Sequence, residues 1–594
     1  MKTLLYQAVR QTLTVYVALM LTWGLLATVP AHSQTVRDRR AIVRVGMWTL
    51  WRDRNLALSP AASGGISIES CSPCTAHKVK EEVSLHADGS NVELEIQGRT
   101  IHANRVQVAG GARLTAHDES VLLNYPVTFS AKGGVLAIAV NMPVERYVER
   151  VVASESGPDD SDQSLEALAV VVRSFALHQN HGHAEFDLCD STHCQLLHWG
   201  SNLPRQAAAH RTVLMTAGET LWFHGRRAEA YFGKDCGGET ASPDEIWSRS
   251  RSAEPYLRSR ADSYCVRRGG NMWASTLERS ELTQALAAAG LMRPGWKNLA
   301  VSRRGESGRA IAVKIDGSEI SAEEFRLAVG KALGWNKVPS TWFEVSEQGD
   351  RFLFHGRGWG NGVGLCQKGA AEMGAQAKSM AEILQQYFPG TMVADEETGH
   401  SWIALEGEGF TLETLEDGDR TFLTVFSKAL REAQARSGFH ESARITVRAF
   451  GSIDAFRNET LAPGWVSAFS EGNWIGTQPM ATLAARRLLE PTMLHEFLHA
   501  LVEHETGPKA PLWLREGLVE FWSEDSKTGG FPSMPIDSVE ALLSRATAAS
   551  ESETAHHAAG EYCAILLSRY GREQVIAWLR SGVPDAVTAS LGQR

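Results

Sequence analysis

The sequence predicts an α+β protein, in which a mixed β-rich and helical module is followed by a mostly helical module with a small sheet. Short runs that alternate apolar and polar residues, as at 42–47, 92–96 and 135–140, are typical of strands and come first. From Ser164 the apolar residues recur every three or four positions, which predicts one buried helix face. No regular βαβ alternation follows, so we do not expect a doubly wound sheet.

Length and composition indicate an ordinary globular protein with two or more domains. The chain has 594 residues, of which 43% are hydrophobic, and single cores seldom exceed about 300 residues. A polar, turn-rich stretch at 394–400 predicts a boundary, which divides the chain into 34–395 and 396–594. The net charge of -10 is mild and excludes nucleic acid as an expected partner.

Residues 1–33 predict a signal peptide. An apolar stretch at about 13–29 follows basic residues, and the small side chains of Ala31 and Ser33 suit signal peptidase, with cleavage before Gln34. The alternative is an uncleaved membrane anchor, because the apolar run is near the minimum length for spanning. In both cases we expect export to the periplasm or cell envelope, with membrane contact only if the segment is retained.

Eight cysteines are too few for a disulfide scaffold in an oxidising compartment. Cys71 and Cys74 are expected to form a tight disulfide, because no second CxxC is present to complete a metal site. Cys236 and Cys265 are candidates for a separate disulfide.

A His/Cys cluster offers four zinc-capable donors within twelve residues: His183, Cys189, His193 and Cys194. Two imidazoles and two thiolates suit tetrahedral Zn²⁺. The alternative is a Cys189–Cys194 disulfide with surface histidines. Four protein ligands leave no open position, so zinc here would brace the loop.

Glu155 stands just before a Gly-Pro bend at 157–158, in front of the predicted long helix. A carboxylate fixed there can lie at the floor of a cleft, whereas the alternative interpretation is an ordinary surface glutamate.

Several ordered blocks resemble the stage II sporulation protein D family, also called the amidase-enhancer family, over about 44–391. The blocks are VASE at 152–155 with its following helix at 164–177, FDLCDSTHCQ at 186–195, CGGET at 236–240 and GRGWGNGVGLCQKGA at 356–370. Members of this family include lytic transglycosylases, which cut between MurNAc and GlcNAc and leave a 1,6-anhydro sugar.

The resemblance implies that Glu155 is the catalytic acid and then base, acting on peptidoglycan glycan strands. It also implies a cell-wall amidase as a candidate partner, and some members carry a His/Cys zinc site in the same segment. The remaining glycan-site candidates are Arg173, Gln195, Asn361 and Gln367. Asn361 and Glu239 depart from the family pattern, in which His or a basic residue is usual. The alternative is therefore a non-catalytic scaffold that enhances an amidase.

A second candidate site is the HExxH motif at 495–499. The apolar face of Leu494, Phe497, Leu498 and Leu501 predicts a helix here. On this helix His495 and His499 share one face and can bind one Zn²⁺, while Glu496 can act as general base. Downstream, PLWLREGLVEF at 511–521 resembles the signature of gluzincin metallopeptidases.

This second resemblance implies that Glu516 is the third zinc ligand and that Glu520 orients a ligating histidine. Tyr562 is a candidate for stabilising the tetrahedral intermediate, and 464–469 is a candidate edge strand for binding peptide. The predicted function is a lytic transglycosylase with a zinc metallopeptidase module. A wall-targeted zinc peptidase is a further alternative.

Overall fold

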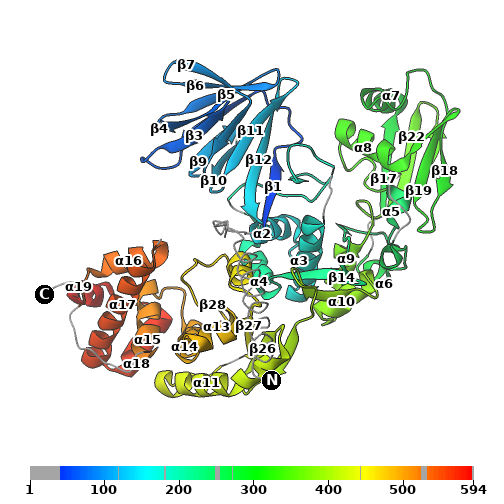
Figure 1. Ribbon diagram of the computed structural model, residues 1–594. Helices are drawn as coiled ribbons and strands as arrows, with labels where there is room; N and C mark the ends of the chain where they lie inside the picture. Colours follow the sequence, from blue (N-terminus) through cyan, green and yellow to red (C-terminus); the bar gives the residue numbers. More distant parts are fainter. Residues whose placement is uncertain are drawn as a thin grey trace, which may run out of the picture. The chain divides into compact units, whose positions relative to one another are not determined.

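The computed structural model describes residues 41–117, 119–178, 182–201, 203–247, 254–269, 272–441, 443–523, 532–546 and 548–591. The predicted signal peptide at 1–33 lies outside these ranges. The fold is α+β, as predicted, with several separate sheets and many helices (Figure 1). No helix in the described ranges is long and apolar enough to span a membrane.

Two sheets at the start of the described chain share one hydrophobic core. Their strand orders are β13-β1-β12-β11-β8-β3-β4 and β10-β9-β2-β5-β6-β7. The predicted strands at 42–47, 92–96 and 135–140 are confirmed as β1, β6 and β12. The strands are β1 (Ile42–Met47), β2 (Asn55–Pro60), β3 (Ile66–Cys71), β4 (Cys74–Val79), β5 (Val83–Asp88), β6 (Asn91–Ile96), β7 (Arg99–Ala103), β8 (Arg105–Val108), β9 (Ala112–Ala116), β10 (Glu119–Leu123), β11 (Val127–Lys132), β12 (Val135–Pro143) and β13 (Leu188–Cys189).

The hairpin between β3 and β4 confirms the expected disulfide between Cys71 and Cys74.

Three helices pack on this region: α2 (Val144–Glu155), α3 (Asp162–Leu177) and α4 (Gln206–Met215). The helix predicted from Ser164 is confirmed as α3, although it is buried on nearly every side rather than on one face. Ser161 caps α3 by accepting a hydrogen bond from the backbone N–H of Ser164.

The segment before α3 differs from the prediction. We expected Glu155 at a bend, but it is the last residue of α2. The cause is an apolar stripe with helical spacing that buries one face of α2. The stripe consists of Val144, Tyr147, Val148, Val151 and Val152.

The middle of the chain holds two further cores. The core around α3 contains β14 (Glu219–Phe223), β15 (Arg226–Arg227), β16 (Phe232–Gly233), α5 (Pro243–Ile246), η1 (Pro255–Leu257), α6 (Ser263–Arg267), β23 (Leu365–Cys366), α9 (Gln367–Ala375), α10 (Met380–Tyr387) and β24 (Met392–Asp395). The other contains β17 (Met272–Glu278), α7 (Arg279–Ala288), β18 (Leu299–Arg304), β19 (Ala310–Ile315), β20 (Ser318–Ser321), α8 (Ala322–Leu333), β21 (Phe343–Gln348) and β22 (Arg351–Arg357). The sequence pattern did not indicate this separate core.

The remaining chain forms a small sheet and a group of helices around one core. The sheet order is β25-β26-β27-β29-β28, so β28 is an edge strand. The elements are β25 (Ile403–Glu406), β26 (Phe410–Thr414), η2 (Asp417–Phe422), α11 (Leu423–Ser437), β27 (Ile445–Ala449), α12 (Ile453–Thr460), β28 (Ala468–Glu471), β29 (Trp474–Thr477), α13 (Met480–Ala485), α14 (Leu489–Glu505), α15 (Leu512–Ser523), α16 (Ile536–Arg545), α17 (Ala549–Tyr570), α18 (Arg572–Ser581) and α19 (Asp585–Leu591).

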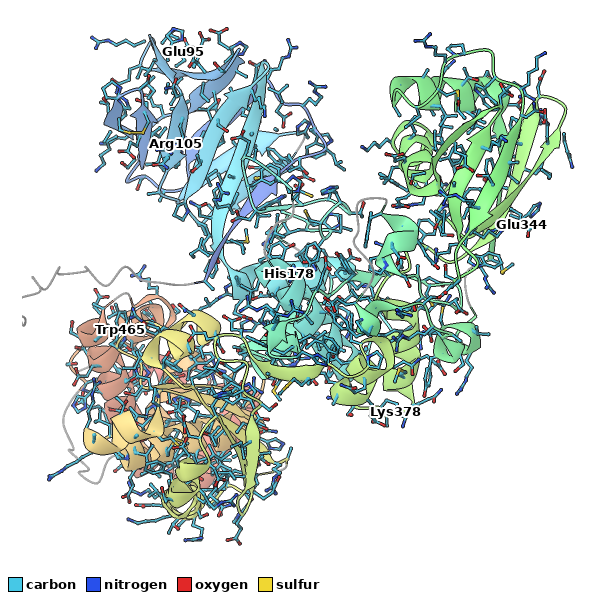
Figure 2. The ribbon with its side chains drawn as sticks, turned by 45° about the vertical axis from the view of Figure 1, so that its right-hand side comes forward. Glu95, Arg105, His178, Glu344, Lys378 and Trp465 are labelled. Atoms are coloured by element: carbon cyan, nitrogen blue, oxygen red, sulfur yellow. A yellow bond between two sulfur atoms is a disulfide. The ribbon has the colours of Figure 1, made fainter. Side chains whose placement is uncertain are left out.

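The expected edge strand at 464–469 overlaps β28 only at Ala468 and Phe469. Trp465, labelled in Figure 2, precedes the strand and is 43% exposed.

A buried arginine connects the C-terminal sheet to β14. Arg448 of β27 is 2% exposed and donates hydrogen bonds to Glu219 Oε1 at 2.7 Å and to the carbonyl oxygen of Ala217 at 2.8 Å. Its guanidinium also lies 2.7 Å from Glu413 of β26. A buried guanidinium with two carboxylate partners ties these elements together through charge.

A second contact at the same junction involves α4. The imidazole of His210 lies 3.2 Å from Glu149 of α2 and 3.0 Å from Glu471 of β28. Leu214, one turn further along α4, joins a small core with Trp474 of β29. Charged and apolar contacts therefore both connect the C-terminal sheet to α4.

Candidate functional site

Glu155 is half-buried at the C-terminal end of α2. Burial raises the pKa of its carboxyl to about 7, against the opposing effects of the Lys234 charge, a hydrogen bond from the backbone N–H of Leu196 and one from the Gln367 side chain. The Gln367 amide also donates to the carbonyl oxygen of Glu155 at 3.2 Å. A carboxyl with this pKa is present in both its acid and base forms near neutral pH.

The segment that carries Leu196 is fastened along α2. Ser154 accepts a hydrogen bond from the backbone N–H of His198 at 3.0 Å. Arg150 donates to the carbonyl oxygens of His198 at 2.8 Å and Gly200 at 2.9 Å. These bonds fix the N–H donor of Leu196 relative to the end of the helix.

The four glycan-site candidates fall in different environments. Gln367 contacts Glu155, as described above. Gln195 is buried, accepts a hydrogen bond from the Tyr147 hydroxyl at 2.9 Å, and has an Nε2 without a hydrogen-bond partner among the described residues. Asn361 is half-buried, and its Oδ1 accepts from the backbone N–H of Val363 at 2.9 Å.

The expectation that Arg173 contacts glycan is wrong. Its side chain is 0% exposed and donates to both carboxylate oxygens of Glu145, at 2.7 and 2.6 Å. A third nitrogen donates to the carbonyl oxygen of Glu219 at 3.0 Å. Arg173 therefore holds α2, α3 and β14 together in the protein interior.

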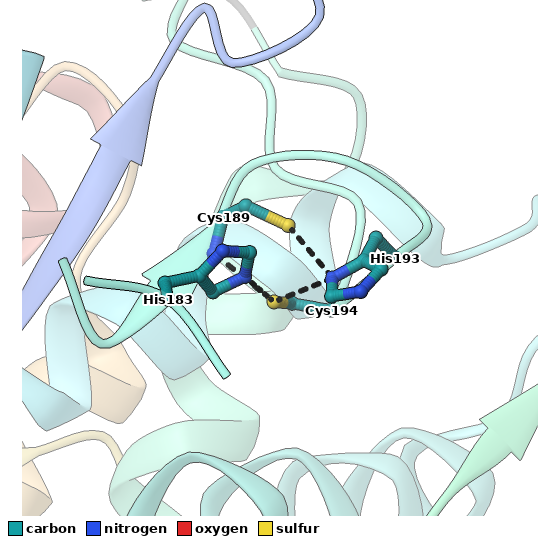
Figure 3. A group of neighbouring side chains, drawn as sticks. All are labelled: His183, Cys189, His193 and Cys194. Atoms are coloured by element: carbon teal, nitrogen blue, oxygen red, sulfur yellow. Dashed lines mark hydrogen bonds between the residues drawn. The ribbon is translucent and has the colours of Figure 1, made fainter. Parts of the chain in front are cut away.

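The members of the His/Cys cluster do converge (Figure 3). Their four donor atoms all lie within 4.8 Å of one another, with His183 Nε2 3.2 Å from Cys194 Sγ and His193 Nδ1 3.7 Å from both sulfurs. Cys189 and Cys194 are free thiols rather than a disulfide. A hydrogen bond from Cys194, with a contribution from His193, lowers the pKa of Cys189 to about 3. The donor set fits tetrahedral zinc.

The cluster lies close in sequence to Glu155's hydrogen-bond donor. Cys194 is two residues before Leu196, and the intervening Gln195 is hydrogen-bonded to Tyr147 of α2. Anything that fixes Cys194 therefore also restrains the N–H group that contacts Glu155.

The HExxH motif lies on α14, as predicted. His495 Nε2 and His499 Nε2 are 3.0 Å apart, and His499 Nε2 is 3.5 Å from Glu516 Oε2 on α15. Burial and the neighbouring His499 lower the pKa of His495 to about 3, which keeps its imidazole neutral. Burial opposes ionisation of Glu516, yet the charges of His499 and His556 lower its pKa to about 2. Two imidazoles and a carboxylate suit zinc, although these donors are less tightly gathered than the His/Cys cluster.

Glu496 is 7% exposed, and burial raises the pKa of its carboxyl. The hydroxyl of Ser470 on edge strand β28 donates to it. The predicted general base thus lies beside the strand on which a peptide substrate would be expected to pair.

Glu520 was expected to orient a ligating histidine. The hydroxyl of Ser523 lies 3.2 Å from His495 Nδ1. Glu520 lies against Gly560 of α17. Burial opposes protonation of His556, but its hydrogen bond to Glu516 raises its pKa, and the charge of Glu520 adds a smaller contribution.

Tyr562 has a different environment from the one expected. The residue is buried, and its hydroxyl donates to the carbonyl oxygen of Met534 at 2.9 Å. The residue of α17 that reaches the site is His556, whose Nε2 is 3.2 Å from Glu516. Gly517 permits this approach, because a β-carbon there would lie 2.3 Å from the carbonyl oxygen of Ala559. The sequence offered no motif around His556 that would have identified it.

Family models match two segments of the chain. Residues 132–223 match a family described as stage II sporulation protein, a segment that contains Glu155 and the His/Cys cluster. Residues 267–364 match a domain of unknown function, which corresponds to the separate core of β17–β22.

Relatives extend the similarity. An uncharacterized protein of Brachyspira hyodysenteriae is 30% identical over 262 residues, which is 43% of this chain and 68% of that protein. Stage II sporulation protein D of Bacillus subtilis is 26% identical over 323 residues, or 52% of this chain and 87% of that protein. The amidase enhancer of Bacillus subtilis is 21% identical over 296 residues, or 41% of this chain and 39% of that protein.

Proposed function

Because the chain belongs to the stage II sporulation protein D family, we propose that it acts on peptidoglycan glycan strands as a lytic transglycosylase. The observation that carries this proposal is the half-buried carboxyl of Glu155, whose pKa of about 7 suits both donation and recovery of a proton.

Glu155 would act twice in the reaction. Its acid form protonates the glycosidic oxygen as the bond to the sugar breaks, and the resulting carboxylate takes the proton of the C6 hydroxyl as the 1,6-anhydro ring closes. No second carboxylate is required, because an internal hydroxyl replaces the water used by hydrolysing glycosidases. Leu196 and Gln367 orient the carboxyl, and Lys234 keeps its pKa from rising further.

We also propose zinc at the His/Cys cluster, where it would have a structural role. Four protein donors leave no position for substrate. The residues themselves support this role, since Cys189 has a thiolate-favouring pKa and Cys194 continues directly into the segment fastened to α2.

For the C-terminal module we propose a zinc peptidase in which His495, His499 and Glu516 hold the metal. Zinc bound there would polarise a peptide carbonyl as a Lewis acid. Glu496 would accept and return the proton of the attacking water, helped by the raised pKa that burial gives it. Edge strand β28 would bind the peptide by strand addition.

Two variants test these assignments on purified peptidoglycan and on casein. Glu155→Gln should abolish anhydro-muropeptides, detected by mass spectrometry, and leave casein cleavage intact. Glu496→Gln should have the opposite effect. Asp159→Asn is the matched control, because its carboxylate is 80% exposed and only four residues from Glu155.

Other outcomes identify other functions. If wild-type protein yields no anhydro product but speeds digestion by an added amidase, the first module is an amidase-enhancing scaffold and the transglycosylase proposal fails. If Glu155→Gln leaves wall binding and casein cleavage unchanged and anhydro products never appear, a wall-targeted peptidase remains.

Export is part of the same proposal. Peptidoglycan lies outside the cytoplasm, and the predicted signal peptide at 1–33 lies outside the described residues. N-terminal sequencing of the mature protein should begin at Gln34; a mature chain that keeps residues 1–33 would favour a membrane anchor.

A further inference from the structure

A second group of donors lies outside both sites. Its four members are all buried: Cys236, Asp262, Cys265 and Cys366. We call them the buried Cys/Asp cluster. They come from three segments, the loop after β16, helix α6 with its capping residue, and the junction of β23 and α9. One donor atom from each lies within 4.8 Å of the other three.

The sulfurs of the cluster lie beside the carboxylate of Asp262, and Cys265 Sγ also donates a hydrogen bond to Oδ1 of the buried Asp235 at 3.1 Å. Cys236 Sγ lies 3.3 Å from Asp262 Oδ2, and Cys366 Sγ accepts a hydrogen bond from the backbone N–H of Cys236 at 3.3 Å. The other oxygen of Asp262 caps α6 by accepting from the backbone N–H of Cys265. Tyr387 donates to Asp262 Oδ2 at 2.9 Å. The carboxylate is thus fixed in position by α6 and by α10.

We propose that the buried Cys/Asp cluster binds one zinc ion as a closed structural site. Three thiolates and a carboxylate give the four N, O or S donors that tetrahedral zinc prefers. Zn–S bonds of about 2.3 Å place tetrahedral sulfurs about 3.8 Å apart, within the observed spread. Binding would displace the three thiol protons.

A disulfide accounts for this cluster less well. Cys236 and Cys265 are candidates for a disulfide, but the structure brings a third sulfur, from Cys366, to the same point, and all three are free thiols. Three sulfurs can form only one disulfide, which would leave a thiol buried beside Asp262. A metal uses all four donors at once.

The charge around the cluster is consistent with an anionic metal centre. Zinc with three thiolates and one carboxylate has a net charge of −2. Arg309 is 0% exposed and donates to the carbonyl oxygen of Cys236 at 2.7 Å, while its Nε and Nη1 have no hydrogen-bond partner among the described residues. Lys368 lies 3.3 Å from Asp235, the neighbour of Cys236. A buried guanidinium with unused donors needs compensating negative charge nearby.

The position of the cluster would give a bound metal a structural role near Glu155. Cys366 immediately precedes Gln367, and Cys236 is two residues after Lys234. The strands beside them are joined by the parallel pairing of Gly233 with Cys366. A zinc ion here would lock together the two segments that bring Gln367 and Lys234 to Glu155.

The first test uses the wild-type full-length chain, purified without reductant or chelator. Native mass spectrometry and peptide mapping should find Cys236, Cys265 and Cys366 reduced, and alkylation of all three should become fast only after a chelator is added. A disulfide between any two of them, or equally fast alkylation before the chelator, would overturn the proposal.

The second test counts metal in variants. Elemental analysis should show that Cys366→Ser loses one zinc equivalent per chain relative to wild type, whether or not the His/Cys cluster has been removed by Cys189→Ser. Cys563→Ser is the matched control, because Cys563 is equally buried but lies alone on α17. Cobalt-loaded wild type should show a thiolate charge-transfer band that weakens in Cys366→Ser and not in Cys563→Ser. Zinc content unchanged by Cys366→Ser would refute the site.

Discussion

Replacing Glu155 with glutamine should make the protein more stable at alkaline pH while removing its proposed activity. The carboxyl has a pKa near 4.5 in an unfolded chain and of about 7 in the folded protein, because burial disfavours its charge. A carboxyl whose pKa is raised by folding contributes stability that is complete below about pH 4.5 and is lost as the pH rises towards 7. The amide of the Glu155→Gln variant has no charge to lose, so the variant escapes this cost.

The structure sets the size of the effect. The shift of the Glu155 pKa from 4.5 to about 7 corresponds to at most about 3 kcal/mol when fully expressed above pH 8. At pH 5 most of this cost is absent, and the two proteins should differ by less than about 1 kcal/mol. Chemical denaturation at both pH values measures the difference, with the exposed Asp159→Asn as the control.

The pH dependence is the decisive part. A variant that gains the same stability at pH 5 and pH 8 would owe it to packing, and the assignment of a raised pKa to Glu155 would be refuted. Wild-type cleavage should have its maximum near pH 7 if the same carboxyl serves as acid and base. An optimum several units away would contradict the mechanism.

Three further changes test the contacts that support the sites. Arg448→Met should lower the free energy of unfolding, measured by chemical denaturation, by about 3–5 kcal/mol, because it leaves Glu219 buried without its partner. A double variant that also carries Glu219→Gln should recover part of this loss. Tyr147→Phe should cost about 1–3 kcal/mol by the same assay, since the Gln195 carbonyl loses its donor; a neutral result would contradict the hydrogen bond. The two carboxylates beside His210 raise its pKa to about 9, so His210→Gln should destabilise the protein most below pH 6.5, and the difference should fade in melting curves as the pH rises through 9.

Local patterns in the sequence were sufficient for much of the fold. The strands β1, β6 and β12 and the helices α3 and α14 follow from periodicity alone, because one buried face imposes a repeat of two or of three to four residues. The same rule would have found α2, whose apolar stripe precedes Glu155.

Long-range packing could not be predicted in this way. Arg173 stands in the segment that matches the sporulation protein family, yet its partner Glu145 lies on another helix and places it in the interior. A motif identifies the residue type but not the direction in which the side chain points.

The same limit applies to donors that are distant in the chain. The four members of the His/Cys cluster lie within twelve residues and were found from spacing, and the structure does gather them. Cys366 reaches Cys236 only through the pairing of β16 with β23, and His556 reaches Glu516 only through the close approach of α15 and α17. No spacing rule covers such contacts.

The arginine at the junction has a consequence for how this chain can be dissected. Cutting between residues 395 and 396 looks harmless on the sequence, since the stretch is polar and rich in turns. It would, however, strip Glu219 of the guanidinium of Arg448 and uncover apolar side chains such as Leu214 on one fragment and Trp474 on the other. Fragments made in this way would expose apolar surface, and the carboxyl of Glu219 would lose its ion pair. Activities measured on such fragments would therefore not represent those of the intact chain. Point substitutions in the intact chain are the sounder route.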